Sequence, residues 1–263
     1  MTLMLKRFFA PLVLLLGLAV PLPAQTEPAM ERVLIPTLLP PEGILGGFGS
    51  LWMTRFRARN NADQPVLIRD YDYGCRMGNC PPAPPTLPKV TFSPQTQGAP
   101  PTYGLFMFVE RAFIDDVSFS LHVQDQTRQS IHQGTRIPIV REQDFRPVIR
   151  LLDVPTTGDF RALIRIYSPH TGRVRIRYYA SDPSNIHPVV PSENQIATEE
   201  RDLEQPPPLV QQKFPATAVV EAIPSSPTTR AVVEIEALTP DMSVWAYASV
   251  THNVTQHVTI IAP

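Results

Sequence analysis

Short apolar runs separated by turn-forming residues extend along the whole chain. About seven runs rich in β-branched and aromatic residues fall in the first half, among them "LWMTRFRARN", "YGLFMFVE" and "DVSFSLHVQD". A second set of about eight follows, from "FRPVIRLLDV" to "HVTIIAP". No window of about 11 to 18 residues repeats its apolar positions every 3.6 residues, so helices should be short or absent. The pattern predicts an all-β chain of short antiparallel strands.

Period-two alternation assigns faces to individual strands. In "WMTRFRA" we expect Trp52 and Phe56 to enter the core, while Met53, Arg55, Arg57 and Arg59 occupy the opposite face. In "SVWAYASVT" the aromatic residues Trp245 and Tyr247 alternate with small ones. We expect the small residues to pack inside a sandwich and the aromatic ones to cover its flank; the small residues are Val244, Ala246, Ala248 and Val250.

Proline and chain length set the domain organisation. The 31 prolines cluster at "LPPEG", "CPPAPPTLP", "GAPPT" and "EQPPP", where they mark loops rather than strands. A boundary after residue 145 leaves two pieces, 25–145 and 146–263, each long enough for an antiparallel sandwich of about 100 residues. The polar stretch "SDPSNIHPVVPSENQ" is the competing boundary, but it would leave too short a C-terminal piece.

Residues 1–24 have the pattern of a signal peptide. Lys6 and Arg7 precede the apolar run "FFAPLVLLLGLAV", and "PLPA" offers a cleavage point after Ala24. The run is shorter than the roughly 20 residues that cross a bilayer, and no second run follows. We expect a secreted or periplasmic protein without a transmembrane segment in the mature chain. Gln25 stands where a lipoprotein would have cysteine.

Overall charge gives no electrostatic preference for a partner. The formal net charge is −1, so the composition predicts no general attraction to nucleic acid or to an anionic membrane. The partner expected for an exported module is instead an unknown protein or a glycan at the cell surface.

Two motifs suggest chemistry of their own. Cys75 and Cys80 in "GCRMGNC" are most simply a small disulfide; a zinc site would need ligands that no second cysteine pair supplies.

In "THNVTQH" an unbroken strand would be too long, so we expect a hairpin turn around Asn253 to Gln256, with His252 and His257 facing each other across it. A metal there would need a third ligand that the sequence does not indicate.

Three segments resemble a known group of proteins. They are "IPTLLPPEGILGGFGSLWMTRFRARNNADQPVLI", "SFSLHVQDQTRQSIHQGTRIPIVREQDFR" and "WAYASVTHNVTQHVTIIAP". The group is one of uncharacterised exported bacterial proteins with Ig-like β-sandwich domains. The resemblance implies two Ig-like antiparallel β-sandwich domains after a signal peptide, and it brings no catalytic residues.

One arginine-rich surface offers a binding mechanism. A turn at Thr171-Gly172 suggests a hairpin, which would join two arginine-bearing strands into one face made of Arg161, Arg165, Arg173, Arg175 and Arg177. Such a face could bind an anionic ligand. The alternative is that the arginines pair with Glu234 and Glu236, which share one face of "AVVEIEA".

Catalytic motifs do not point to an enzyme. The sequence has no G-x-S-x-G, S-x-x-K or H-E-x-x-H motif, so we assign no catalytic residue, metal or cofactor. The leading hypothesis is a non-catalytic exported binding, adhesion or envelope-associated module. The alternative is a carbohydrate-active or other hydrolase whose site is assembled from loops.

The cysteine motif gives a first test. If Cys75 and Cys80 are bonded in the exported protein, thiol labelling of the unreduced, denatured chain should give almost no signal, because the compartment is oxidising. Labelling after reduction should give two thiols per chain. Two labelled thiols before reduction would contradict the assignment.

Overall fold

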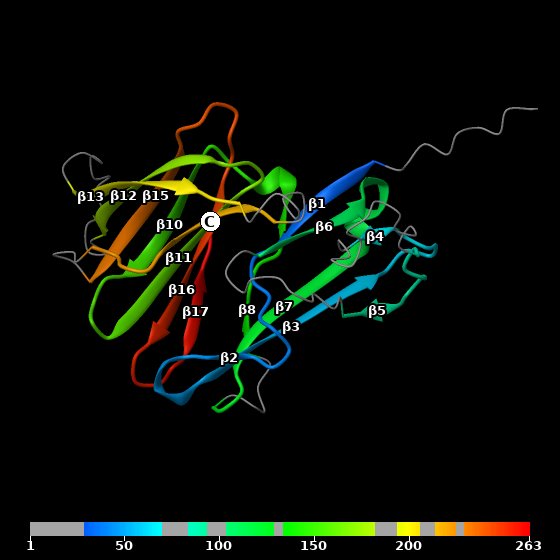
Figure 1. Cartoon of the computed structure of the whole chain (residues 1–263), viewed down its shortest axis with the longest axis horizontal. Helices are drawn as coiled ribbons and strands as arrows, with labels where there is room; N and C mark the ends of the chain where they lie inside the picture. Colours follow the sequence, from blue (N-terminus) through cyan, green and yellow to red (C-terminus); the bar gives the residue numbers. More distant parts are fainter. Residues whose placement is uncertain are drawn as a thin grey trace, which may run out of the picture.

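The chain folds into four antiparallel β-sheets, seen in a computed structural model (Figure 1). The structure describes residues 29–69, 84–93, 104–128, 134–181, 194–205, 214–224 and 229–263. In these ranges the only helices are three short 3₁₀ segments, at Gly47–Gly49, Arg111–Asp116 and Glu142–Asp144. The all-β prediction is confirmed. Its two pairs of sheets are consistent with two β-sandwich domains.

The first half of the chain forms two sheets. We name the first the β1 sheet: its order is β4-β6-β1-β9, at Ile68–Arg69, Leu105–Glu110, Met30–Ile35 and Val140–Arg141. The second is the β3 sheet, in the order β2-β3-β7-β8 at Ile44–Leu45, Leu51–Asn60, Val117–Asp125 and Thr135–Arg136, with β5 (Thr91–Phe92) pairing with β3. The run "TRIPIV" predicts one strand where the structure has two, β8 and β9, and no predicted strand corresponds to β2.

The second half forms two more sheets, and all eight predicted strands are present. The β12 sheet has the order β10-β15-β12-β13, at Val148–Pro155, Arg230–Ala237, Gly172–Ser181 and Gln195–Leu203. The β11 sheet has the order β14-β11-β16-β17, at Ala216–Val220, Phe160–Ser168, Trp245–His252 and Val258–Ile261.

The predicted hairpin at Thr171-Gly172 is wrong. β11 ends before this turn and β12 begins after it, but β11 pairs with β14 and β16, whereas β12 pairs with β13 and β15. The turn therefore carries the chain from one sheet to the other. Local turn chemistry predicted the reversal of direction but not the change of sheet.

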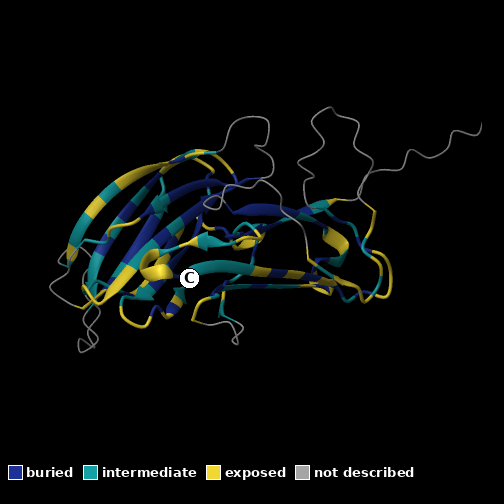
Figure 2. Ribbon diagram, turned by 60° about the horizontal axis from the view of Figure 1, so that its bottom comes forward, coloured by how far each residue is buried: buried dark blue, intermediate teal, exposed yellow. Residues whose placement is uncertain are grey.

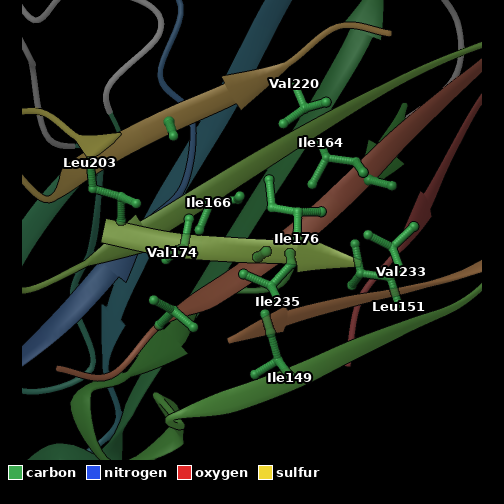
Figure 3. Close-up of a cluster of buried hydrophobic side chains, with 14 of the residues drawn as sticks. Ile149, Leu151, Ile164, Ile166, Val174, Ile176, Leu203, Val220, Val233 and Ile235 are labelled. Carbon is green, nitrogen blue, oxygen red and sulfur yellow. The ribbon is translucent and has the colours of Figure 1, made fainter. Parts of the chain in front are cut away.

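Each pair of sheets encloses an apolar core. The β1 and β3 sheets enclose a core that includes Val33, Leu105, Phe56 and Leu121. The β11 and β12 sheets enclose a larger one, in which aliphatic side chains of both sheets meet (Figure 3). Its fully buried members include Ile164, Ile166, Val174, Ile176, Val233 and Ile235.

A third cluster, which we call the seam, joins the two halves. It is formed by Leu34, Phe106, Val140, Phe145, Tyr167, Trp245 and Tyr247. Alternation explains it: Val33 and Ile35 of β1 point into the first core, and Leu34 between them points into the seam. The β1 and β11 sheets are thus covered on both faces, and buried residues occur in both halves of the molecule (Figure 2).

Specific contacts define the geometry of the seam. The Tyr167 hydroxyl donates a hydrogen bond to the carbonyl oxygen of Pro36. The Tyr167 and Tyr247 rings stack with centroids 6.3 Å apart. Gly104 has φ of +64°, and a Cβ there would lie 2.9 Å from the Pro36 carbonyl oxygen and 3.1 Å from the Tyr167 ring. A larger residue would therefore push the two halves apart.

The predicted faces are confirmed with one exception. Val244, Ala246, Ala248 and Val250 lie in the second core, while Trp245 and Tyr247 cover the flank of that sandwich and belong to the seam. Phe56 lies in the first core. Trp52, expected beside it, is only half-buried and belongs to none of the three clusters. It lies near the end of the sheet, against Gly46.

Two predictions fall outside the described residues. These are the signal peptide at 1–24 and the Cys75–Cys80 disulfide. The boundary between 145 and 146 stays a prediction, although the β1 and β3 sheets use strands from 30–141 and the other two use strands from 148–261.

The two tryptophans of the chain provide a test of the seam. Trp245→Ala should lower the free energy of unfolding by about 3 to 5 kcal/mol, because it removes a buried ring between two sheets. Trp52→Ala is the matched control and should cost clearly less, because Trp52 is partly exposed. Urea denaturation of both variants measures the difference. Equal losses would show that the seam contributes no more than a surface contact.

Candidate functional site

The predicted arginine face is divided between two sheets. Arg173, Arg175 and Arg177 lie on β12, whereas Arg161 and Arg165 lie on β11. Arg161 donates to the Gln256 side chain at 2.9 Å and lies over the Phe48 ring. Arg165 lies in the seam beside Tyr167 and Tyr247. The five residues therefore do not form one surface.

The β12 arginines form a charge ladder with acidic residues of neighbouring strands. Arg177 reaches Glu234 at 2.9 Å and Glu236 at 2.7 Å, both on β15. On β13, Glu200 pairs with Arg175 at 3.0 Å and Asp202 pairs with Arg173 at 2.9 Å.

Arg150 of β10 extends the ladder, donating from Nε to Glu234 at 2.8 Å. The ladder thus contains four arginines (Arg150, Arg173, Arg175 and Arg177) and four carboxylates (Glu200, Asp202, Glu234 and Glu236), so its formal charge is zero. Pairing with Glu234 and Glu236 thus holds for Arg177 and, at 3.7 Å to Glu236, for Arg175, whereas Arg173 pairs with β13. An anionic ligand would have to displace carboxylates that already occupy these guanidinium groups.

Glu234 lies at the centre of the ladder and is nearly buried. Burial acts to raise its pKa, but hydrogen bonds from Arg150 and Arg177 outweigh it and hold the pKa of Glu234 below its usual value. The carboxylate is therefore more stable in the folded chain than in the unfolded one.

A second arginine surface lies on the outward face of the β3 sheet. We call it the basic face: Arg55, Arg57 and Arg59 of β3, Ser118, Ser120 and His122 of β7, and Arg136 of β8. The inward residues of β7 lie in or against the first core, which leaves these alternate positions facing outward. All four arginines are exposed.

Strand register puts an arginine beside a polar side chain at each step along the basic face. Arg59 lies opposite Ser118, Arg57 opposite Ser120 and Arg55 opposite His122. His122 also lies opposite Arg136, so this imidazole has an arginine on either side. The Ser120 hydroxyl lies 3.2 Å from Nδ1 of His122.

The basic face lacks the carboxylates that neutralise the ladder. In the part of the chain that the structure describes, no acidic side chain pairs with Arg55, Arg57 or Arg136. Arg59 donates to Asn61 and Thr91, which are uncharged. Partial burial lowers the pKa of His122, and the positive charges of Arg136 and Arg55 lower it further. The lowered pKa of the imidazole thus reflects, in part, a local excess of positive charge.

The sequence contained part of this surface. Alternation in "WMTRFRARN" places Arg55, Arg57 and Arg59 on one face. It does not indicate which strands pair with β3, and therefore it does not indicate His122, Arg136 or the missing carboxylates. Alternation alone places the arginine row on the face opposite the core and does not mark it as a binding site.

The hairpin predicted at "THNVTQH" is confirmed. β16 ends at His252 and β17 begins at Val258, and the backbone N–H of His252 donates to the His257 carbonyl oxygen at 3.0 Å. Gln256, at the end of the turn, has a left-handed backbone with φ of 56°. Nδ1 of His252 accepts from the Thr255 N–H at 3.1 Å. Among the described residues no three His, Cys, Asp or Glu side chains are grouped to hold a metal.

A small cavity of about 210 Å³ lies at the edge of the first core. Its wall is mainly apolar, with Arg136 and Arg141 among the lining residues. Arg141 is held by Glu31 at 2.7 Å and by Asp115 at 2.6 Å. Both carboxylates are thus paired with one guanidinium group, and neither lines the cavity.

Comparisons with protein-family models, with curated proteins and with solved structures find no match. Within the described ranges, no helix is long and apolar enough to cross a membrane.

The ladder predicts a pH dependence of stability. Because the pKa of Glu234 is lowered on folding, its contribution is complete above the unfolded pKa of about 4.3 and is lost as pH falls through the folded value. Glu234→Gln should therefore flatten the acid side of the stability profile, measured by urea denaturation between about pH 3 and 7. Glu42→Gln, outside the ladder, is the control. A profile unchanged by Glu234→Gln would contradict this role.

Proposed function

We propose that this protein is an exported, non-catalytic β-sandwich module that binds an anionic partner through the basic face of the β3 sheet. One observation carries the proposal: four exposed arginines share a face on which the described residues place no carboxylate. Guanidinium groups bind carboxylate, sulfate and phosphate oxygens through paired hydrogen bonds. A face with this composition is therefore suited to an anion.

The two arginine surfaces of the same chain support this choice. On the ladder, each guanidinium already has a carboxylate partner within 3.0 Å. On the basic face, the cross-strand positions hold Ser118, Ser120 and His122 instead. Serine hydroxyls can donate further hydrogen bonds to an anion without neutralising the arginines. An external anion would meet no internal competitor there.

We also propose that the protein is exported and that its domains have an Ig-like fold. The pattern of residues 1–24 supports export, and the resemblance to exported bacterial sandwich proteins supports the Ig-like assignment. Constant-type Ig domains pair their second strand with their fifth, and their third with their sixth. In the second half of this chain β11 pairs with β14 and β12 with β15, which is the same pattern. It departs at three strands: β10 pairs with β15, β13 pairs with β12 instead of β14, and β16 pairs with β11 instead of β15.

No observation on the described residues favours the alternative of a carbohydrate-active or other hydrolase. That function would gain support from two carboxylates facing a common cleft. Glu31 and Asp115 are held together by Arg141 instead.

Two triple variants with the same change in charge test the proposal. Arg55→Gln/Arg57→Gln/Arg59→Gln should abolish binding to a dextran sulfate surface at low salt, because it removes the arginine row from the basic face. Arg173→Gln/Arg175→Gln/Arg177→Gln removes three arginines from the ladder and should leave most binding intact. Binding of the wild type should fall as salt rises from about 0.05 to 0.5 M.

Thermal melting checks that both variants are folded. Equal loss of binding in the two would indicate a general charge effect, and no binding by the wild type would contradict the proposed function.

A further inference from the structure

The positive groups on the basic face repeat at a fixed interval. Arg55, Arg57 and Arg59 are alternate residues of one strand, and side chains on one face of an antiparallel strand recur about every 7 Å. Each arginine has its own polar neighbour on β7. The face is therefore three similar anion-binding units in a row, and a single compact anion would use only one of them.

We propose that the ligand of the basic face is a linear anionic polysaccharide that lies along β3, and that His122 takes up a proton when the polysaccharide binds. The proposal rests on the proposed function and names the ligand class for the same surface. Carboxylated and sulfated polysaccharides both have anionic groups along an extended chain, and both present oxygens to guanidinium and hydroxyl groups. Their shared chemistry is what the arginine row matches.

The composition of the face favours a glycan over a single-stranded nucleic acid. Proteins that bind single strands without sequence preference stack bases on aromatic side chains. The outward positions of β3 and β7 here hold leucine, methionine, arginine, serine and histidine, and Gln124, the next one along β7, is buried. Phe48 and Phe160, which are exposed, belong to other segments. Among the described residues, the face thus offers charge and hydroxyl groups without a stacking platform.

His122 lies where the polyanion would have its strongest local effect. The groups that face it are Arg55 of β3, Arg136 of β8, and Ser120 and Gln124 of its own strand, with Met53 and Arg57 one step further away on β3. None of these is acidic. The two adjacent arginines oppose protonation of the ring, and its pKa is already lowered in the free protein. An anion across Arg55 and Arg136 would reverse this effect.

The linkage has a definite sign. A bound polyanion raises the pKa of His122, so the complex holds more protons than the free protein in the pH interval between the free and bound values. Affinity should therefore increase as pH falls through this interval and level off below it. The arginines stay charged throughout, so they contribute no pH dependence of their own.

A chain-length series tests the ligand class. Oligogalacturonates of two, four, six and eight sugars, and dextran sulfate fragments of matched length, are titrated by calorimetry. Affinity should rise steeply until the chain covers all three arginines of β3 and then change little per added sugar. Arg57→Gln, in the middle of the row, should weaken the long chains by about fivefold, the upper range for one exposed charge pair. It should affect the disaccharide much less.

The outcomes separate this inference from the proposed function. If galacturonate or sulfate alone binds as well per anionic group as the long chains, the surface binds anions but the linear-chain inference is wrong. Tighter binding of single-stranded oligonucleotides of equal charge would also overturn it. Failure of every anion to bind would contradict the proposed function itself. Preference between the two glycan series identifies carboxylate or sulfate as the recognised group.

A histidine titration tests the proton uptake. The His122 ring signals are assigned by comparison with His122→Gln and followed by NMR against pH, with and without saturating octagalacturonate. The His122 pKa should rise on binding, and His170, exposed in the turn between β11 and β12 of the second half, serves as the internal control. His122→Gln should still bind at high pH but lose the increase in affinity at low pH. An unchanged His122 pKa in the complex would overturn this part.

Discussion

The seam between the two halves is the constraint on which the surface chemistry depends. Tyr167, Trp245 and Tyr247 on one side meet Leu34, Phe106 and Val140 on the other, and this packing covers the outer faces of the β1 and β11 sheets. Both of these sheets are already covered on their inner faces by the two cores. In the part of the chain that the structure describes, the seam therefore leaves the outward faces of the β3 and β12 sheets open.

Both surfaces carry a row of arginines. Within the described residues, carboxylates of neighbouring strands neutralise the row on the β12 sheet, but not the row on the β3 sheet. Arginine alternates along β3 and along β12. Beside β12, the neighbouring strands supply glutamate and aspartate, and the result is a neutral ladder with a nearly buried carboxylate at Glu234. Beside β3, the neighbouring strand supplies serine and histidine. Neighbouring strands thus decide whether an arginine row stabilises its own sheet or remains available to a partner.

Local patterns in the sequence predicted most of the strands and most of their faces. Alternation placed Phe56 in a core and divided Trp245 from Ala246, and the limit on strand length located the break between β16 and β17. These features depend on residues close together in the chain. The left-handed residue of the hairpin, Gln256, is one that turn preferences alone do not single out, because asparagine is the commoner choice.

Pairing between distant strands could not be predicted from local patterns. Arg161 and Arg173 lie on consecutive strands, and a turn between such strands usually implies a hairpin, but here it crosses from one sheet to the other. For the same reason the sequence did not bring Arg136 to His122 or reveal that the arginines of β3 lack acidic neighbours. The sequence therefore predicted the arginine row of the candidate site but not the side chains that neighbouring strands place beside it.

The central claim is that missing carboxylates, and not the arginines alone, make the basic face a binding surface. It is tested most directly by giving β7 the acidic residues that β13 and β15 already have. Ser118→Glu/Ser120→Glu places carboxylates opposite Arg59 and Arg57 while keeping every arginine, and Ser118→Gln/Ser120→Gln is the control of equal size. Calorimetry with a long oligogalacturonate should detect binding in the control and none in the glutamate variant. Undiminished binding by the folded glutamate variant would contradict the account.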